Sequence, residues 1–249
     1  VQTCALPILH QPSDAQHFDA AFVSVNRLRG RKGPFKVADW IMDSGAFTEV
    51  TTHGGYRHSV AEYAAEIRRW ASNGNLLAAV AQDYMCEPFV VAKTGLSVPE
   101  HQRLTVQRYD ELLREDTAGI YILPVLQGYA PEDYVDHLQM YGDRLARGAW
   151  VGVGSVCKRN GDPQAVAAVL VAIKRARSDL MLHGFGLKTT ALAHPLVRSL
   201  LHTADSMAWS FHARRQGRNA NDWREAVRWA DSITSRPVQQ VLDLLMCAA

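Results

Sequence analysis

The feature of this sequence that most restricts its fold is a regular alternation of short apolar runs with amphipathic segments. Several of the runs are apolar without alternation, which is typical of β-strands that are covered on both faces. Eight runs have the length and composition of strands: Cys4–Leu9, Phe22–Val25, Trp40–Asp43, Leu76–Gln82, Ile120–Leu126, Trp150–Gly154, Leu180–Phe185 and Ala204–Ala208.

The segments between these runs have the pattern of amphipathic helices. Apolar side chains recur every three or four residues over Val60–Ile67 and again over Tyr134–Leu145. Pro131 and the pair Asp162-Pro163 are typical of helix starts, because an aspartate caps free amide groups and proline suits the first helical position. Two further helices are expected near the C-terminus, at Asn221–Ile233 and Pro237–Met246.

Alternating strands and helices with right-handed crossovers predict a parallel sheet, either closed into a (β/α)8 barrel or doubly wound. Eight candidate strands favour the TIM-like (β/α)8 barrel, and 249 residues suit one such barrel. We therefore expect a single domain over residues 1–249, with its C-terminal helices at about 221–247.

The composition excludes several classes of protein. The longest apolar runs, such as Ile120–Leu126, are too short to span a bilayer, and no secretory signal opens the sequence. The cysteines are widely spaced without a Cys-x-x-Cys pair, which favours a reducing, cytoplasmic compartment over a disulfide scaffold or zinc finger. The formal net charge is only +2, so contact with a nucleic acid must come from local basic patches.

Polar residues and glycines follow most of the candidate strands. In an α/β barrel the catalytic groups lie at the carboxyl ends of the strands, so these residues are candidates for a common site. Three nearby carboxylates repel one another, and we expect a raised pKa for at least one of them, which suits acid–base catalysis. Taken singly, an aspartate here is often a helix cap and a Gly-x-Gly a tight turn. The strand-end residues are Asp43, Asp83, Gln127, Gly152–Ser155, His183–Gly186 and Asp205.

Five short motifs occur in order along the chain and resemble one known family. They are Asp-Ser-Gly-Ala-Phe at 43–47, Gln-Asp-Tyr-Met-Cys-Glu-Pro at 82–88, Val-Leu-Gln-Gly at 125–128, Val-Gly-Ser at 153–155 and Ala-Asp-Ser at 204–206. In this order they resemble the tRNA-guanine transglycosylases, and more closely their short relatives that insert 7-deazaguanines into DNA. The resemblance covers roughly Trp40 to Ile233.

The resemblance implies a base exchange at C1′ of a nucleotide, similar to retaining glycoside hydrolysis. By position, Asp205 matches the nucleophile that forms a covalent aspartyl–nucleotide intermediate, and Asp43 matches the acid/base residue. Asp83 and Gln127 match residues that bind the guanine edge. The resemblance also implies that the backbones of Gly154 and Ser155 contact the base. Either Tyr84 or Phe47 is expected to stack on it.

Two departures from the family pattern bear on the substrate and on metal binding. Members that act on tRNA carry a Cys-x-Cys-x-x-Cys…His zinc site after the nucleophile strand, whereas only Cys247 follows Asp205 here. We therefore expect no metal and no cofactor, with an improvised site from Cys86, Cys157, His183 and His202 as the alternative. The short chain also favours DNA over tRNA as the polymer.

Basic residues are expected to bind the polymer. Lys158 and Arg159 follow one strand end, and Arg214, Arg215 and Arg218 follow another, so both clusters are expected beside the site. The incoming base would be a 7-deazaguanine such as preQ0, as in queuosine-like chemistry. The sequence leaves open whether a partner protein opens the DNA. The alternative functions are a nucleoside or glycoside hydrolase that uses the same carboxylates, and a non-catalytic nucleic-acid-binding barrel.

Overall fold

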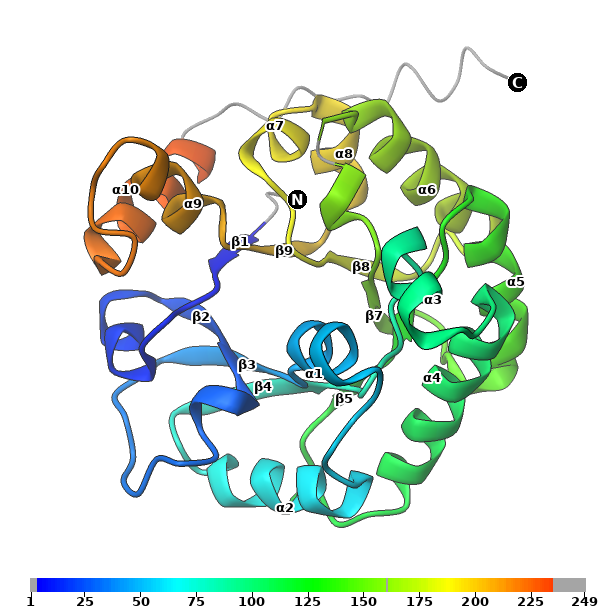
Figure 1. Ribbon diagram of the computed structural model, residues 1–249, viewed down its shortest axis with the longest axis horizontal. Coiled ribbons are helices and arrows are strands. Elements are labelled where there is room, and N and C mark those ends of the chain that lie inside the picture. The colour runs from blue at the N-terminus through cyan, green and yellow to red at the C-terminus, as the bar shows by residue number, and fades with distance from the viewer. Residues whose placement is uncertain (1–3, 160, 235–249) are drawn as a thin grey trace.

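The computed structural model describes residues 4–159 and 161–234, which form an α/β fold with two parallel sheets. One sheet has the strand order β1-β9-β8-β7-β6, and the other has the order β2-β3-β4-β5. Figure 1 shows helices around the outside, with the strands toward the middle. Every ladder between neighbouring strands is parallel, as the alternation of strands and helices predicts.

Each of the eight predicted strand runs overlaps a strand, with boundaries that differ by a few residues. The run Ile120–Leu126 contains two, because Pro124 has no N–H to donate and interrupts the ladder between them. The strands are β1 (Cys4–Pro7), β2 (Ala20–Ser24), β3 (Asp39–Asp43), β4 (Asn75–Val80), β5 (Ile122–Leu123), β6 (Val125–Leu126), β7 (Trp150–Val153), β8 (Met181–Gly184) and β9 (Thr203–Ser206).

The described helices include those with clear sequence signals and several without. The α-helices are α1 (Ala46–His53), α2 (Val60–Trp70), α3 (Pro88–Thr94), α4 (Val98–Leu113), α5 (Pro131–Tyr141), α6 (Pro163–Ala176), α7 (Thr189–Leu192), α8 (Pro195–Leu200), α9 (Ala208–Arg215) and α10 (Trp223–Thr234). Short 3-10 helices are η1 (Pro12–His17), η2 (Val25–Arg27), η3 (Gly142–Arg144) and η4 (Cys157–Arg159). The predicted helix Pro237–Met246 lies outside the described residues.

The helix starts follow the chemistry of their first residues. Asp162 Oδ1 accepts the N–H of Ala165 at 3.1 Å, and Pro163 takes the first helical position of α6, as predicted. Pro131 starts α5 in the same way. At α2, Ser59 and Glu62 form a reciprocal capping box, with Ser59 N–H to Glu62 Oε2 at 2.7 Å.

Two apolar clusters hold the strands in place. The larger lies between the strands and the helices around them, where it includes Trp40, Tyr63, Tyr134 and Leu170. The smaller one draws side chains from strands of both sheets: Leu6, Phe22, Ile41, Ala78, Val80, Leu123 and Val125. The two sheets are therefore packed against each other through their own side chains.

A closed barrel is not detected in the described residues, where the ladders form two separate sheets. At one boundary the two sheets are separated only by Pro124. At the other, β1 and β2 are linked by the isolated parallel bridge between Ile8 and Phe22. None of the described helices has the length and apolar character that a bilayer-spanning segment requires.

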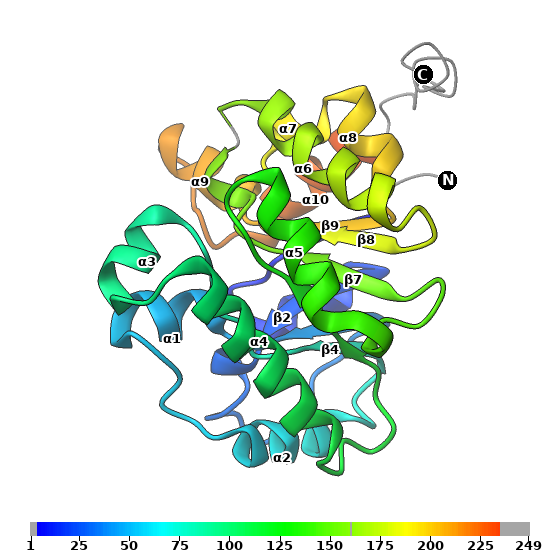
Figure 2. The same ribbon diagram turned by 90° about the vertical axis from the view of Figure 1, so that its right-hand side faces the viewer.

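The parallel arrangement decides where the polar strand ends meet. Because the strands run in the same direction, their carboxyl ends open toward the same side, where α1, α3 and α9 follow β3, β4 and β9. Figure 2 shows these three helices together on one side of the molecule.

Candidate active site

Asp205 lies in β9, and both oxygens of its carboxylate are held. The N–H of Gly186 donates to Oδ1 at 2.7 Å, and Nε2 of His183 lies 2.9 Å from Oδ2. The Asp205 and His183 side chains are both buried. A carboxylate with two fixed partners has a restricted orientation, and such pre-positioning favours a nucleophile.

His183 is itself held from the other side of its ring. Its Nδ1 lies 2.8 Å from Oγ1 of Thr203, and the indole N–H of Trp150 donates to the same oxygen at 3.1 Å. Because the indole can only donate, the Thr203 hydroxyl is free to donate to Nδ1. The Thr203 hydroxyl, both nitrogens of His183 and the Asp205 carboxylate all have hydrogen-bond partners when the neutral imidazole carries its proton on Nε2, facing Asp205.

Asp43 ends β3 directly before α1. The N–H of Gly45 donates to Asp43 Oδ2 at 3.1 Å, and Gly45 has a φ of 78° that favours glycine. Burial raises the pKa of Asp43 to about 6, although a hydrogen bond from Ser24 opposes this, and the charge of Asp205 raises the pKa further. A carboxyl group with this pKa can give or take a proton near neutral pH.

Asp83, Gln127 and Ser155 form a chain of buried polar side chains. Gln127 Nε2 donates to Asp83 Oδ2, and the Ser155 hydroxyl lies 2.6 Å from Gln127 Oε1 and 2.8 Å from Glu87 Oε2. The same hydroxyl accepts the N–H of Cys86 at 2.7 Å. One hydroxyl hydrogen cannot serve both Gln127 and Glu87, so the cluster has more acceptors than donors.

Burial also raises the pKa of Asp83, to about 7, while the hydrogen bond from Gln127 lowers it and the charges of Asp43 and Glu87 raise it. The prediction that at least one strand-end carboxyl has a raised pKa is therefore confirmed. Its physical reason differs from the one expected, because desolvation outweighs repulsion between the carboxylates at both Asp43 and Asp83.

The predicted contact of the Gly154 backbone with the base stays a prediction, and the structure shows a second use for a glycine here. Its N–H donates to Leu126 O at 2.9 Å and its carbonyl accepts the Tyr134 hydroxyl at 2.7 Å, so both backbone groups already have partners. A Cβ at this position would overlap the amide of Gln127. Gly154 therefore leaves the space in which Gln127 reaches Asp83 and Ser155.

The two rings predicted as alternatives for stacking lie in different surroundings. Tyr84 is buried, and its ring packs edge-on against Tyr56 and His101, with centroids 5.7 Å away in both cases. Phe47, in the first turn of α1, is half exposed. Phe47 is thus the more exposed of the two rings.

The predicted basic residues differ in what they already bind. Lys158, Arg214 and Arg215 are exposed, whereas Arg159 is half-buried and donates to Ser155 O at 3.2 Å. Arg218 forms a bidentate ion pair with Glu225, in which Nε lies 2.6 Å from Oε1 and Nη2 lies 2.9 Å from Oε2. Its guanidinium therefore has a partner within the chain, and its predicted phosphate contact stays a prediction.

No group of three or more His, Cys, Asp or Glu side chains within residues 4–159 and 161–234 is arranged to hold a metal ion. The alternative zinc site from Cys86, Cys157, His183 and His202 is therefore not found. Instead, His183 binds Asp205 and Thr203, and Cys157 Sγ lies 3.4 Å from Glu87 Oε1.

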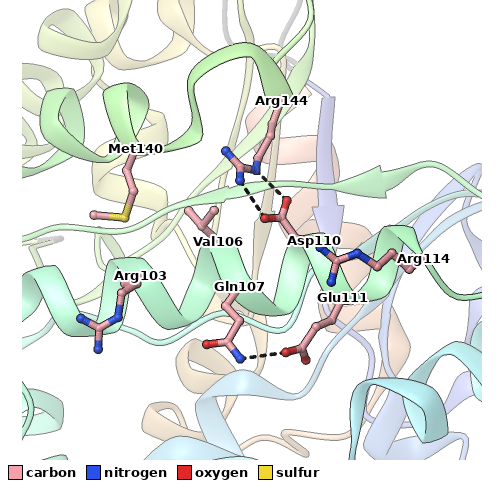
Figure 3. A pocket seen from close by; sticks show the side chains of 8 residues that line it. All are labelled: Arg103, Val106, Gln107, Asp110, Glu111, Arg114, Met140 and Arg144. Atoms are coloured by element: carbon pink, nitrogen blue, oxygen red, sulfur yellow. Dashed lines mark hydrogen bonds and ion pairs between the residues drawn. The ribbon is translucent and has the colours of Figure 1, made fainter.

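A cavity of about 440 Å³ lies elsewhere, beside α4 and α5 on the outer side of the fold (Figure 3). Two of its lining residues, Arg144 and Asp110, form an ion pair, with Nε and Oδ1 2.6 Å apart. It shares no lining residue with the strand-end cluster. Its lining consists of Arg103, Val106, Gln107, Asp110, Glu111, Arg114, Met140 and Arg144.

Sequence reasoning gave no role to Glu87, Thr203 or Trp150, and it considered His183 only as a strand-end residue and an alternative metal ligand. A histidine inside the apolar run Leu180–Phe185, directly before Gly184, is the signal that could have pointed to the Asp205 pair. The partners Thr203 and Trp150 come from different strands, and their spacing in the sequence does not indicate a contact.

Comparison with known proteins shows which family the sequence resembles over most of its length. A family model described as DpdA, DeoxyPurine in DNA protein A, matches residues 9–241. A search among curated proteins finds nothing similar. The matched range contains the whole strand-end cluster, from Asp43 to Asp205.

Proposed function

Because the chain belongs to the DpdA family, the 7-deazaguanine DNA transglycosylases related to tRNA-guanine transglycosylases, we propose that it replaces guanine in DNA with a 7-deazaguanine such as preQ0. The family supports a transglycosylase that modifies DNA. The residue assignment is supported by one observation, namely that Asp205, Asp43 and Asp83 all lie at the carboxyl ends of parallel strands. They lie close enough for the charge of Asp205 to raise the pKa of Asp43 and for the charge of Asp43 to raise the pKa of Asp83.

In the proposed reaction, Asp205 attacks C1′ of the target nucleotide. The C1′–O bond forms as the C1′–N9 bond breaks, and the electron pair of the broken bond leaves with guanine, which takes a proton from Asp43. The incoming base then gives its N9 proton back to Asp43 and attacks C1′, releasing Asp205. The raised pKa of Asp43 suits both transfers, because a carboxyl near its pKa is an acid in one step and a base in the next.

Asp83 and Gln127 bind the base edge in this proposal. Their cluster with Ser155 and Glu87 has more acceptors than hydrogens, and a guanine-type edge brings N–H donors to such a group. A base without these donors would leave buried acceptors unpaired, which costs about 1–3 kcal/mol for each. Tyr84 supports the pocket by packing, and Phe47 offers the exposed ring.

The DNA backbone lies along the rim in this proposal, where Lys158, Arg159, Arg214 and Arg215 follow the strand ends. A further basic contribution comes from Arg27, because Arg27 and Arg214 both lie close enough to His10 for their charges to lower its pKa, in addition to the larger effect of burial. Such a cluster binds phosphates in a salt-dependent way.

We also propose that the two sheets form one barrel in a single domain. The supporting observations are the apolar cluster shared by both sheets, the Ile8–Phe22 bridge between β1 and β2, and the single residue Pro124 between β5 and β6. A barrel would bring all the strand ends around one opening.

The test is base exchange on defined polymers. Duplex DNA, single-stranded DNA and tRNA that carry labelled guanine are incubated with a 7-deazaguanine, and the digested nucleosides are analysed by mass spectrometry. We expect the deazaguanine nucleoside to form in DNA. Exchange in tRNA alone would move the substrate to RNA, and release of guanine without incorporation would identify a hydrolase.

A further inference from the structure

Exposed aromatic rings and basic side chains alternate on the face that carries the strand ends. Phe47, Phe89 and Tyr129 are 50%, 48% and 45% exposed. Lys158 Nζ lies 5.4 Å from the centre of the Phe47 ring and 5.8 Å from that of Phe89. Arg159 Cζ lies 4.4 Å from the centre of the Tyr129 ring. Because Lys158 and Arg159 are neighbours in the chain, these five residues form one continuous strip.

The strip begins at the wall of the base pocket. Arg159 donates to the carbonyl of Ser155 at 3.2 Å and also to the carbonyl of Tyr129, so its position is tied to both. Ser155 is in turn hydrogen-bonded to Gln127. At the other end, Phe47 stands in the first turn of α1, just beyond Asp43. A polymer whose nucleotide enters the pocket must therefore pass over or beside the strip.

The side chains of the strip indicate which kind of molecule it can bind. Rings of this kind accept the flat faces of unpaired bases, and lysine or arginine beside them neutralises the phosphate of the same nucleotide. A duplex keeps its base faces stacked inside and presents only phosphates and groove edges, for which exposed phenyl rings offer little. The pairing of each ring with a cation also favours a polyanion over an apolar protein surface.

We propose that this strip binds a single-stranded DNA segment, with the bases next to the target guanine stacked on Phe89 and Tyr129, while Phe47 faces the target base. The inference rests on the proposed function in one respect, namely that the target nucleotide must leave its stack to reach Asp205. Its neighbours then lose a stacking partner, and the strip replaces that partner. Unpaired DNA is accordingly the preferred form of the substrate.

The experiment measures binding without chemistry, in the Asp205→Asn background. A short single strand carries one guanine with 2-aminopurine beside it, and the fluorescence of this analogue falls when it stacks. The binding of this single strand is compared with the binding of the matched duplex and of free guanine. We expect single-stranded DNA to bind more tightly than the duplex, with quenching of the 2-aminopurine.

Phe89→Ala and Tyr129→Ala are the informative variants, because neither residue belongs to the base pocket. Each should weaken binding of single-stranded DNA about 5- to 100-fold and reduce the quenching, while affinity for free guanine stays unchanged. The matched control is Tyr121→Ala, since Tyr121 is also an exposed ring, at 41%, but precedes β5 and lies at the opposite ends of the strands.

The outcomes separate this inference from the proposed reaction. Unchanged DNA affinity and unchanged fluorescence in both variants would overturn the strip, as would equal or tighter binding of the duplex. Loss of stacking in both variants by an enzyme that exchanges no base would support the strip and contradict the transglycosylase.

Discussion

At the scale of single residues, the proposed chemistry depends on how Asp205 is held. Gly186 and His183 occupy its two oxygens, and Thr203 and Trp150 hold the far side of the His183 ring. In the proposed reaction, the carboxylate regains its charge when the ester with C1′ breaks, and N–H donors already in place would stabilise it without rearrangement. We therefore propose His183 as a positioning residue for Asp205.

The first prediction concerns Thr203→Val, which keeps the shape of the side chain and removes its hydroxyl. Without the Thr203 donor, Nδ1 of His183 loses its hydrogen-bond partner, and the ring proton is no longer directed to Nε2. We expect turnover to fall roughly 5- to 30-fold, with free-base affinity unchanged. Thr203→Ser should retain the activity. The ¹⁵N shifts of the His183 ring report the tautomer directly, and an unchanged Nε2–H form in Thr203→Val would contradict the assignment.

The second prediction concerns the stability cost of the carboxyl cluster. Asp83 has a native pKa of about 7, above its ordinary value of 3.8. Between these values the folded state holds a proton that the unfolded state has lost, so the unfolding free energy falls as pH rises, by up to about 1.4 kcal/mol per pH unit. The stability is present at low pH and is lost as pH passes 7.

Asp83→Asn should therefore flatten the dependence of unfolding free energy on pH between about 4 and 7, and should stabilise the protein at pH 8. Denaturant unfolding across this range measures both effects. The control is Asp110→Asn, on the outer face, which should leave the Asp83-dependent slope in place. A slope that is identical in wild type and Asp83→Asn would show that burial does not raise this pKa.

At the scale of elements, the segments that follow the strands carry the residues proposed for the chemistry and for DNA binding. The helix α9 follows β9 and exposes Arg214 and Arg215, and η4 follows β7 and carries Lys158 and Arg159. Arg218, just beyond α9, is paired with Glu225. Arginines that are close together in the sequence therefore have different roles.

The third prediction uses this contrast. Arg214→Ala combined with Arg215→Ala should weaken DNA binding and reduce its log–log salt slope by about one unit for each phosphate that the variant no longer binds. Arg218→Ala serves as the control, because its guanidinium is engaged with Glu225, and it should leave the slope unchanged. Titrations over a salt series measure the slopes. An equal reduction in both variants would mean that the Glu225 pair opens on DNA.

The sequence was sufficient to locate the strands and helices that have strong local signals. It was insufficient for elements whose formation depends on tertiary contacts. All eight strand runs and the starts of α5 and α6 follow from apolar runs and from Pro131 and Asp162. The helix α4 was not predicted, because its exposed face is rich in polar residues and its apolar positions are spread over a long segment. The break at Pro124 was also missed, although proline cannot donate to a ladder.

At the scale of the whole molecule, the parallel topology explains why a site could be predicted at all. The carboxyl ends of parallel strands meet on one side, so Asp43, Asp83, Gln127 and Asp205 could be assigned to one cluster from their positions after apolar runs. The contacts inside the cluster, such as that between Ser155 and Glu87, join segments far apart in the sequence. They follow from the packing of β7 against the segment after β4, which local patterns do not encode.

The central claim is that Asp205 carries the nucleotide covalently, and the mass of the intact protein mixed with guanine-containing DNA tests it most directly. We expect a covalent protein–DNA adduct whose proteolytic fragment places the ester on Asp205, and no adduct with Asp205→Asn. Asp43→Asn is the companion variant, since it keeps Asp205 and removes only the proposed acid/base group. An adduct of normal yield in Asp205→Asn, or one attached to another residue, would contradict the account.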